Sequence, residues 1–376
     1  MKKFWPAFAA TTAATVALIY VKGYGYIFKA LKMNIDKGPT TPSIDDLEKF
    51  PSVTVPKGIS SFWQKSEDFN QNKIPDAVLQ DLEKTNTAAL LVVKNGKLAH
   101  EQYWGDHYAH SLMNSFSMAK GILSLLVGAA INERKIESEN QLLSDFLPQY
   151  SESEFGKFLT LKHLMTMQAG LDWQEEYHHP FAPNSKQYFV QDLASQVLER
   201  KVKEMPGVKY EYQSAAPQLL GFALRKAVGK PLTQYLSEKI WQPLGMESSA
   251  KWSVDASGME KAFCCIHATA RDFAKIGQLV LDGGKVDGKT IISEKFIQAA
   301  LHPTAANDAF GYTIWANLDC AIPNHFLYGF LGQFIIIVPE KQMVIVKMGH
   351  CKDLPVDEKL RPLQVKLLVE TLSGIF

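Results

Sequence analysis

One stretch of this sequence decides its fold, and it reads Asn114-Ser115-Phe116-Ser117-Met118-Ala119-Lys120-Gly121 before an apolar run that ends at Ile131. The run is long, mostly unbranched and free of proline, so it predicts a largely buried helix. Ser117 lies at the start of this helix. Lys120 follows three residues later, and residues three apart on a helix project from the same face. The stretch therefore predicts a serine hydroxyl beside a lysine amine.

The pairing of Ser117 with Lys120 suits acyl transfer. A serine hydroxyl is a weak nucleophile until a neighbouring base takes its proton. An ammonium held among apolar groups near the positive end of a helix shifts toward its neutral, basic form. Free amides at the helix start could also hold an oxyanion. The alternative is a serine that only caps the helix, followed by a surface lysine.

The same spacing occurs a second time, as Ser248-Ser249-Ala250-Lys251, after the turn-like Pro243-Leu244-Gly245-Met246. No apolar helix follows this copy, and we interpret it as chance. The spacing alone is therefore a weak signal, and its meaning depends on the sequence around it.

Bulk composition excludes several classes of function. The chain has 376 residues, 46% of them hydrophobic, which allows one large domain or two smaller ones. A net charge of +1 gives no sign of a surface that binds polyanions, so we expect no nucleic-acid partner. Cys264, Cys265, Cys320 and Cys351 lack the CxxC spacing and are expected to be buried or idle thiols. Adjacent histidines such as His178-His179 point apart and no HExxH is present, so we expect neither a metal nor another cofactor.

The N-terminus has the pattern of an export signal. Lysines at positions 2 and 3 precede an uncharged run from Phe4 to Val21. We expect residues 1–36 to be an uncleaved signal anchor with a juxtamembrane segment, or a cleaved signal peptide; a helix of a cytosolic protein is the alternative. The predicted location is the inner membrane facing the periplasm, or the periplasm if the signal is cleaved. Residues 37–58, rich in Pro, Thr, Ser and Asp, are predicted to be a linker or extended arm, and 59–376 the folded domain.

Strand signals lie at both ends of this domain. Asn95-Gly96 separates two strand-like runs, 89–94 and 97–104, and predicts a hairpin after a helix near 76–84. Strands are also expected at 311–315, 332–338 and 343–348, before a last helix at 363–373. The middle is helical, including a helix from Thr160 to Gly170. The pattern predicts an α+β fold, a central antiparallel sheet flanked by helices with an inserted, mostly helical region.

At this point the chain resembles the serine β-lactamase and penicillin-binding-protein superfamily, in its class-C-like, esterase-rich branch, and within it the 6-aminohexanoate-dimer hydrolase group. The resemblance covers about residues 59 to 374. It is carried by five stretches in the family's order: Ser117-Met118-Ala119-Lys120, the segment from His163 to Trp173, Tyr212-Gln213-Ser214, the pair Gly229-Lys230-Pro231 and Pro243-Leu244-Gly245-Met246, and Tyr328-Gly329-Phe330-Leu331-Gly332-Gln333.

The resemblance implies a β-lactamase-like fold and roles for individual residues. Ser117 would be the nucleophile, Lys120 its base and Tyr212 a second proton-transfer group. The backbone amides of Ser117 and Phe330 would form the oxyanion hole. Residues expected to contact substrate are Trp173, Tyr177, Ser214, Gly329 and Gln333.

Two positions depart from the family pattern. Ser214 stands where many members have asparagine, and Leu327-Tyr328-Gly329 stands where they have Lys-Thr-Gly. The second departure removes a carboxylate-binding cation that β-lactamases and D,D-peptidases use. It favours a small-molecule or short-peptide amide or ester as the substrate.

Three hypotheses follow from the sequence. The first is an amidase or esterase that forms an acyl-enzyme on Ser117. The second is a D,D-peptidase or β-lactamase acting on cell-wall peptides or β-lactams. The third is a non-catalytic scaffold of the penicillin-binding type. Oligomeric state and the identity of the substrate stay open.

Overall fold

The hairpin predicted at Asn95-Gly96 forms one edge of the main sheet in the computed structural model. The structure describes residues 17–19, 21, 23–38, 41–177, 179 and 181–376. Strands β2 (Thr87–Lys94) and β3 (Lys97–Tyr103) pair antiparallel. Asn95 and Gly96 have φ of +50° and +72°, as a tight hairpin turn with two left-handed residues requires. The hairpin prediction is confirmed.

The main sheet has six antiparallel strands in the order β3-β2-β12-β11-β10-β9. The other four are β9 (Trp315–Asn317), β10 (Asn324–Gly329), β11 (Gln333–Val338) and β12 (Met343–Gly349). The strands predicted at 332–338 and 343–348 are confirmed. The one predicted at 311–315 begins only at Trp315, because Thr313 has a φ of +54° that interrupts an extended run.

Helices cover both faces of this sheet, which explains why β11 and β12 are apolar almost throughout. Helices α4 (Met118–Asn132) and α10 (Ala270–Leu281) lie on the face that carries Leu327 and Ile335. Helix α12 (Leu363–Leu372) packs on β11 from the opposite face and contacts α3 (Asp76–Lys84).

A second sheet of four short strands has the order β1-β5-β6-β4. Its members are β1 (Ser52–Val55), β5 (Ala250–Ser253), β6 (Ile266–Ala268) and β4 (Met113–Asn114). Strand β1 belongs to residues 37–58, the predicted linker or arm. Ile44 and Val55 of this stretch are fully buried. The arm therefore packs against the domain, and the folded unit begins before residue 59.

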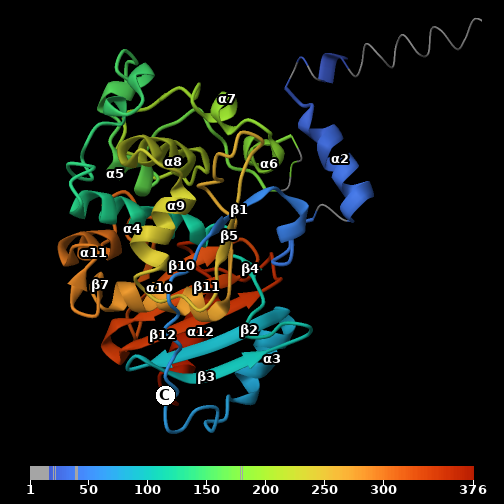
Figure 1. Ribbon diagram of the computed structural model, residues 1–376, viewed down its shortest axis with the longest axis vertical. Coiled ribbons are helices and arrows are strands. Elements are labelled where there is room, and N and C mark those ends of the chain that lie inside the picture. Colours follow the sequence, from blue (N-terminus) through green and yellow to red (C-terminus); the bar gives the residue numbers. More distant parts are fainter. Residues whose placement is uncertain (1–16, 20, 22, 39–40, 178, 180) are drawn as a thin grey trace, which may run out of the picture.

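The inserted helical region lies above the main sheet in Figure 1, between α4 and β5. It contains α5 (Leu161–Met165), α6 (Pro183–Phe189), α7 (Leu193–Val197), α8 (Ala215–Val228), α9 (Leu232–Leu236) and the π-helical turn η5 (Ser237–Trp241). Short 3₁₀ turns lie at Leu143–Asp145, Pro148–Tyr150 and Gly156–Phe158. The predicted α+β architecture with its helical insertion is confirmed.

One helix is shorter than its sequence pattern predicts. Helix α5 begins after Thr160, whose hydroxyl accepts from the backbone N–H of His163, but it ends at Met165 rather than at Gly170. Met167 has a φ of +56°, which a right-handed helix cannot accommodate, so the segment turns away before the glycine.

The remaining elements are peripheral. They are α2 (Tyr26–Lys37), η1 (Leu47–Lys49), the small hairpin β7 (Lys285–Val286) and β8 (Lys289–Thr290), α11 (Glu294–Leu301) and η6 (Pro339–Lys341). Helix α2 contacts α6 (Figure 1). The predicted membrane anchor at 4–21 falls almost entirely outside the described residues and stays a prediction. Within the described part of the chain, no helix combines the length and hydropathy needed to span a bilayer.

Candidate active site

The candidate nucleophile lies at the junction of β4 and α4. Ser117 is the N-cap residue of α4, and Phe116 before it has a φ of +43°, a conformation that costs a bulky residue about 1–3 kcal/mol. Two contacts hold this backbone in place. The N–H of Phe116 donates to Asn114 Oδ1 at 2.9 Å, and the N–H of Ser115 donates to the carbonyl of Ile266 at 2.8 Å. This bend between β4 and α4, the catalytic elbow, places Ser117 at the edge of a cavity.

A glycine lets α4 approach the main sheet at this point. A Cβ on Gly121 would lie 2.7 Å from Leu327 Cδ2 on β10, closer than real side chains come. Because Gly121 directly follows Lys120, the start of α4 lies against the end of β10. Ser117 therefore lines the same cavity as Gly329 and Phe330.

Ser117 and Lys120 contact each other directly. Lys120 Nζ donates to Ser117 Oγ at 2.7 Å and to the carbonyl of Phe263 at 2.8 Å. The Ser117 side chain makes no capping bond to its own helix. Lys120 is only 2% exposed, so it does not lie on the surface. Both observations exclude the alternative of a capping serine with a surface lysine.

The surroundings of Lys120 favour its neutral form. Burial lowers the pKa of Lys120 from 10.5 to about 8, opposed in part by the negative charge of Glu175. At pH 7 about a tenth of such amines are neutral. A neutral amine can keep one N–H on the Phe263 carbonyl and use its lone pair to accept the proton of Ser117.

Tyr212, the predicted second proton-transfer group, lies beside the Ser117–Lys120 pair. The Lys120 ammonium lies 5.1 Å from the centroid of the Tyr212 ring. Burial raises the pKa of the Tyr212 phenol far above 10, with a hydrogen bond to Ser117 lowering it and Glu175 raising it further. The phenol is therefore protonated at neutral pH and can donate a proton, but it is a poor base.

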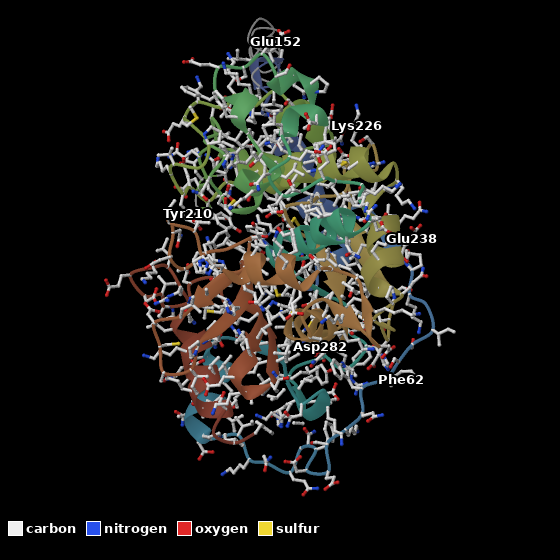
Figure 2. All side chains as sticks on the ribbon, turned by 90° about the vertical axis from the view of Figure 1, so that its left-hand side faces the viewer. Phe62, Glu152, Tyr210, Lys226, Glu238 and Asp282 are labelled. Carbon is white, nitrogen blue, oxygen red and sulfur yellow. A yellow bond between two sulfur atoms is a disulfide. The ribbon has the colours of Figure 1, made fainter. Side chains whose placement is uncertain are left out.

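Two cavities meet at Ser117. The larger, about 590 Å³, extends along β10 and is lined largely by aromatic side chains, including Tyr212, Trp315, Tyr328 and Phe330. Figure 2 shows Tyr210, another of its lining residues, where the helical region meets the main sheet. The smaller, about 190 Å³, lies toward α6. A substrate with its scissile carbonyl at Ser117 could place one part in each cavity.

Glu175 lines both cavities, and sequence reasoning did not identify it. Its carboxylate accepts hydrogen bonds from the Trp173 indole, the Tyr177 hydroxyl, and both the backbone N–H and the hydroxyl of Ser214, at 2.7–2.9 Å. It thereby joins the loop after α5 to the start of α8. Its only sequence signal is its position in an aromatic and acidic loop.

Only some of the five residues predicted to contact substrate line the cavities at Ser117. Tyr177, Ser214 and Gly329 line the cavities. Trp173 lines neither cavity, because its indole is buried and donates a hydrogen bond to the Glu175 carboxylate. Gln333 does not either: it accepts from the N–H of Leu331 and donates to the carbonyl of Gly349. The polar groups of Trp173 and Gln333 are thus engaged within the protein, and their role as substrate contacts stays a prediction.

Phe330, whose backbone amide is predicted to belong to the oxyanion hole, lines both cavities. Its ring stacks on Tyr177 with centroids 5.0 Å apart. Ser117 lines both cavities as well and lies at the positive end of the α4 dipole. The role of the two backbone amides stays a prediction.

The prediction of idle thiols is wrong for one pair of cysteines. Cys264 and Cys265 form a disulfide between adjacent residues, and Cys264 lines the smaller cavity. Cys265 has a φ of +72°, and this tight turn lets neighbouring side chains meet. The pair directly follows Phe263, whose carbonyl accepts from Lys120. Cys320 and Cys351 are free thiols.

Potential metal ligands lie elsewhere. The sequence predicted no metal site at His178-His179. His178 falls outside the described residues, and His179 is exposed. Within the described residues, one cluster of three ligating side chains is present, Asp45 with His107 and His350, and it lines neither cavity at Ser117.

The fold and this site define a class of protein: a β-lactamase-like domain with a serine and a lysine at the start of its buried helix. The Beta-lactamase family model matches residues 75–370, so the chain belongs to the Beta-lactamase family. It is 26% identical over 247 residues to the 6-aminohexanoate-dimer hydrolase of Paenarthrobacter ureafaciens, covering 61% of this chain and 60% of that protein. The chain thus spans somewhat less than two thirds of that relative's length.

Solved structures resemble the chain in fold. One, from Bacillus anthracis and provisionally described as a 6-aminohexanoate-dimer hydrolase, superposes with a TM-score of 0.73 and 22% identity over 88% of this chain and 92% of the other. A family VIII carboxylesterase gives 0.63 and 16% identity over 84% and 99%. The predicted resemblance to this family and to the 6-aminohexanoate-dimer hydrolase group is confirmed.

Proposed function

We propose that this protein is a serine hydrolase that cleaves an amide or ester bond through an acyl-enzyme on Ser117. The observation that carries the proposal is the 2.7 Å contact between Lys120 Nζ and Ser117 Oγ, made by a lysine whose pKa is lowered to about 8. A neutral lysine in contact with a serine hydroxyl is the activated nucleophile that acyl transfer needs. The hydrolases among the similar proteins support the same reaction class.

The reaction divides between three side chains. Ser117 Oγ attacks the substrate carbonyl carbon while its proton passes to Lys120. The oxyanion that forms is held by the amides of Ser117 and Phe330. Tyr212 protonates the leaving nitrogen or oxygen as its bond to carbon breaks, and the Lys120 ammonium returns a proton to the phenolate. Water then hydrolyses the ester on Ser117 by the same transfers in reverse.

The cavity lining indicates the kind of substrate. Aromatic side chains line much of the larger cavity, where the rings of Tyr177 and Phe330 stack on each other. Cavities of several hundred Å³ suit small molecules and short peptides. We therefore propose a small amide or ester with an apolar part along β10.

One observation favours the second candidate, hydrolysis of a β-lactam or cell-wall peptide. Lys352 lines the larger cavity, with its amine 5.6 Å from the centroid of the Phe330 ring. It offers a cation in the cavity that Tyr328 and Gly329 also line, whereas Leu327 stands where the family has its third-motif lysine. Asp353 lines the same cavity, however, and reduces the positive charge there.

The test is covalent labelling of the purified full chain with a fluorophosphonate probe, followed by peptide mass mapping. One adduct on Ser117 is expected, lost in Ser117→Ala and in Lys120→Ala. The second Ser-x-x-Lys copy provides matched controls, and Ser248→Ala and Lys251→Ala should label normally. Folded protein without an adduct on Ser117 would favour the non-catalytic scaffold.

Substrate panels then separate the two enzymatic candidates. Turnover of p-nitrophenyl esters and small amides without nitrocefin hydrolysis supports the first. Efficient nitrocefin hydrolysis that falls in Lys352→Ala supports the second.

A further inference from the structure

Three side chains that catalysis does not use converge beside the N-terminal arm. Asp45 belongs to the N-terminal arm, His107 to the loop between β3 and β4, and His350 follows the last residue of β12. One ligand atom from each lies within 4.8 Å of the other two. We propose that Asp45, His107 and His350 bind one divalent transition-metal ion of the zinc type.

The distances fit such an ion. His107 Nε2 lies 3.0 Å from Asp45 Oδ1, and His350 Nε2 lies 3.5 Å from Asp45 Oδ2. Bonds of about 2.1 Å at tetrahedral angles separate ligand atoms by about 3.4 Å. Small side-chain adjustments would therefore bring all three groups onto one ion, with the fourth position left for water.

The orientation of His107 points to a cation. Its Nδ1 lies 3.1 Å from the backbone carbonyl of Trp104, which can only accept, so Nδ1 carries a proton. In the neutral ring the lone pair of Nε2 then faces the Asp45 carboxylate at 3.0 Å. Two acceptors at that distance repel each other, and either a second proton on the ring or a metal ion between the two atoms relieves this repulsion. An imidazole N–H held by a backbone carbonyl is also the usual support of a metal-ligating histidine.

The surrounding cavity suits the same ligand. It is open, about 850 Å³, and its lining includes the carboxylates of Asp45, Glu48, Glu83 and Asp106 without a lysine or arginine. The negative field would attract a cation. Two imidazoles and one carboxylate select zinc-type ions over Mg²⁺ and Ca²⁺, which prefer oxygen ligands only.

A metal here would fasten the arm next to the catalytic elbow. Asp46, the neighbour of Asp45, accepts from Asn114 Nδ2 at 2.8 Å and from the Tyr188 hydroxyl at 2.7 Å. Asn114 in turn holds the backbone of Phe116. The ion would thus be structural, and its ligands would act on Ser117 only through the arm.

The experiment uses the full chain, freed of metal with a chelator and then titrated with ZnCl₂ by calorimetry and with CoCl₂ by visible absorption. One equivalent of Zn²⁺ should bind and raise Tm, and Co²⁺ should show the d–d bands of a four- or five-coordinate site. His107→Gln and His350→Gln should each weaken Zn²⁺ binding by roughly 100-fold or more. MgCl₂ should give no response.

Two control variants decide whether binding is specific. His110, an exposed histidine on the loop of His107, and Cys351, the neighbour of His350, are not in the cluster. His110→Gln and Cys351→Ser should bind Zn²⁺ as the unaltered chain does. Zn²⁺ binding that survives in the folded double variant His107→Gln/His350→Gln would overturn the proposal. So would no Zn²⁺ binding by the unaltered chain, which would leave His107 and Asp45 as an ordinary ion pair.

Discussion

The two Ser-x-x-Lys stretches of this chain have the same spacing and different structures. In the first, Ser117 begins the 15-residue helix α4, and Lys120 donates to its hydroxyl. In the second, Lys251 lies in strand β5 and donates instead to Thr54 Oγ1 on the neighbouring strand, at 2.7 Å.

The backbone explains the difference. Helical residues three apart share a face, whereas Ser248 lies in a bend before β5, outside the strand that carries Lys251. The helix also buries its lysine, and burial lowers the pKa of Lys120. Spacing therefore predicts a reactive pair only where a buried helix carries it.

The largest expected effect tests the comparison directly. Lys120→Ala should lower kcat by roughly 10³- to 10⁴-fold, because it removes the base that activates Ser117. Lys251→Ala should leave kcat unchanged. Steady-state kinetics with a p-nitrophenyl ester measures both. A similar loss in both variants would remove the distinction between the two stretches.

Tyr212→Phe should lower kcat on amides by about 10²- to 10³-fold, since the leaving amine needs a proton. The loss should be smaller on p-nitrophenyl esters, whose leaving group departs as a stable anion. Tyr210→Phe, two residues away on the same cavity, is the matched control. Equal losses on amides and esters would contradict a role for Tyr212 in leaving-group protonation.

The pH profile reports the neutral fraction of Lys120. The base is the deprotonated amine, so kcat/KM should rise with pH and level off above about 8. Below that value it should fall about tenfold per pH unit, to about a hundredth of the plateau at pH 6. Lys251→Ala should keep this profile. A profile flat between pH 6 and 9 would contradict the assignment of Lys120 as base.

Glu175→Gln should lower kcat/KM by roughly tenfold, because an amide nitrogen cannot accept from Tyr177 or Ser214 as the carboxylate does. Glu175 raises the pKa of Lys120, so its removal should move the acidic limb of the pH profile to lower pH. A loss of activity with an unmoved limb would assign Glu175 to loop structure alone.

The smallest effect concerns the disulfide, which directly follows the Phe263 carbonyl that accepts from Lys120. The double variant Cys264→Ser/Cys265→Ser should lower kcat a few-fold, by loosening the turn that carries the Phe263 carbonyl. The loss should stay small because the Trp252 indole donates to the carbonyls of Lys261 and Cys264, both at 3.0 Å. Cys320→Ser is the control. A loss as large as that of Lys120→Ala would make the disulfide essential.

Local patterns predicted the parts of this molecule that local physics controls. The apolar run after Ser117 could only be a buried helix, and Asn95-Gly96 could only make a tight hairpin turn. The order of motifs from Ser117 to Gln333 then identified the family. Their roles were assigned by resemblance, because spacing alone did not distinguish Tyr212 from a core aromatic residue.

Other features depend on contacts between residues far apart in the sequence. Trp173 and Gln333 looked like substrate contacts, yet their polar groups are used by Glu175 and by the turn after β10. The Phe263 carbonyl reaches Lys120 across 143 positions of sequence. No periodicity or spacing records such pairings, because they arise only when the elements pack.

The sequence by itself thus determined the α+β fold, the helix that carries Ser117 and Lys120, and the family. The tertiary structure decided which Ser-x-x-Lys pair is joined, that Glu175 connects both cavities, that Cys264 pairs with Cys265, and that Asp45 meets His107 and His350. The reason is physical. Helix and turn formation are set by neighbours along the chain, whereas burial, pKa and the meeting of side chains are set by neighbours in space.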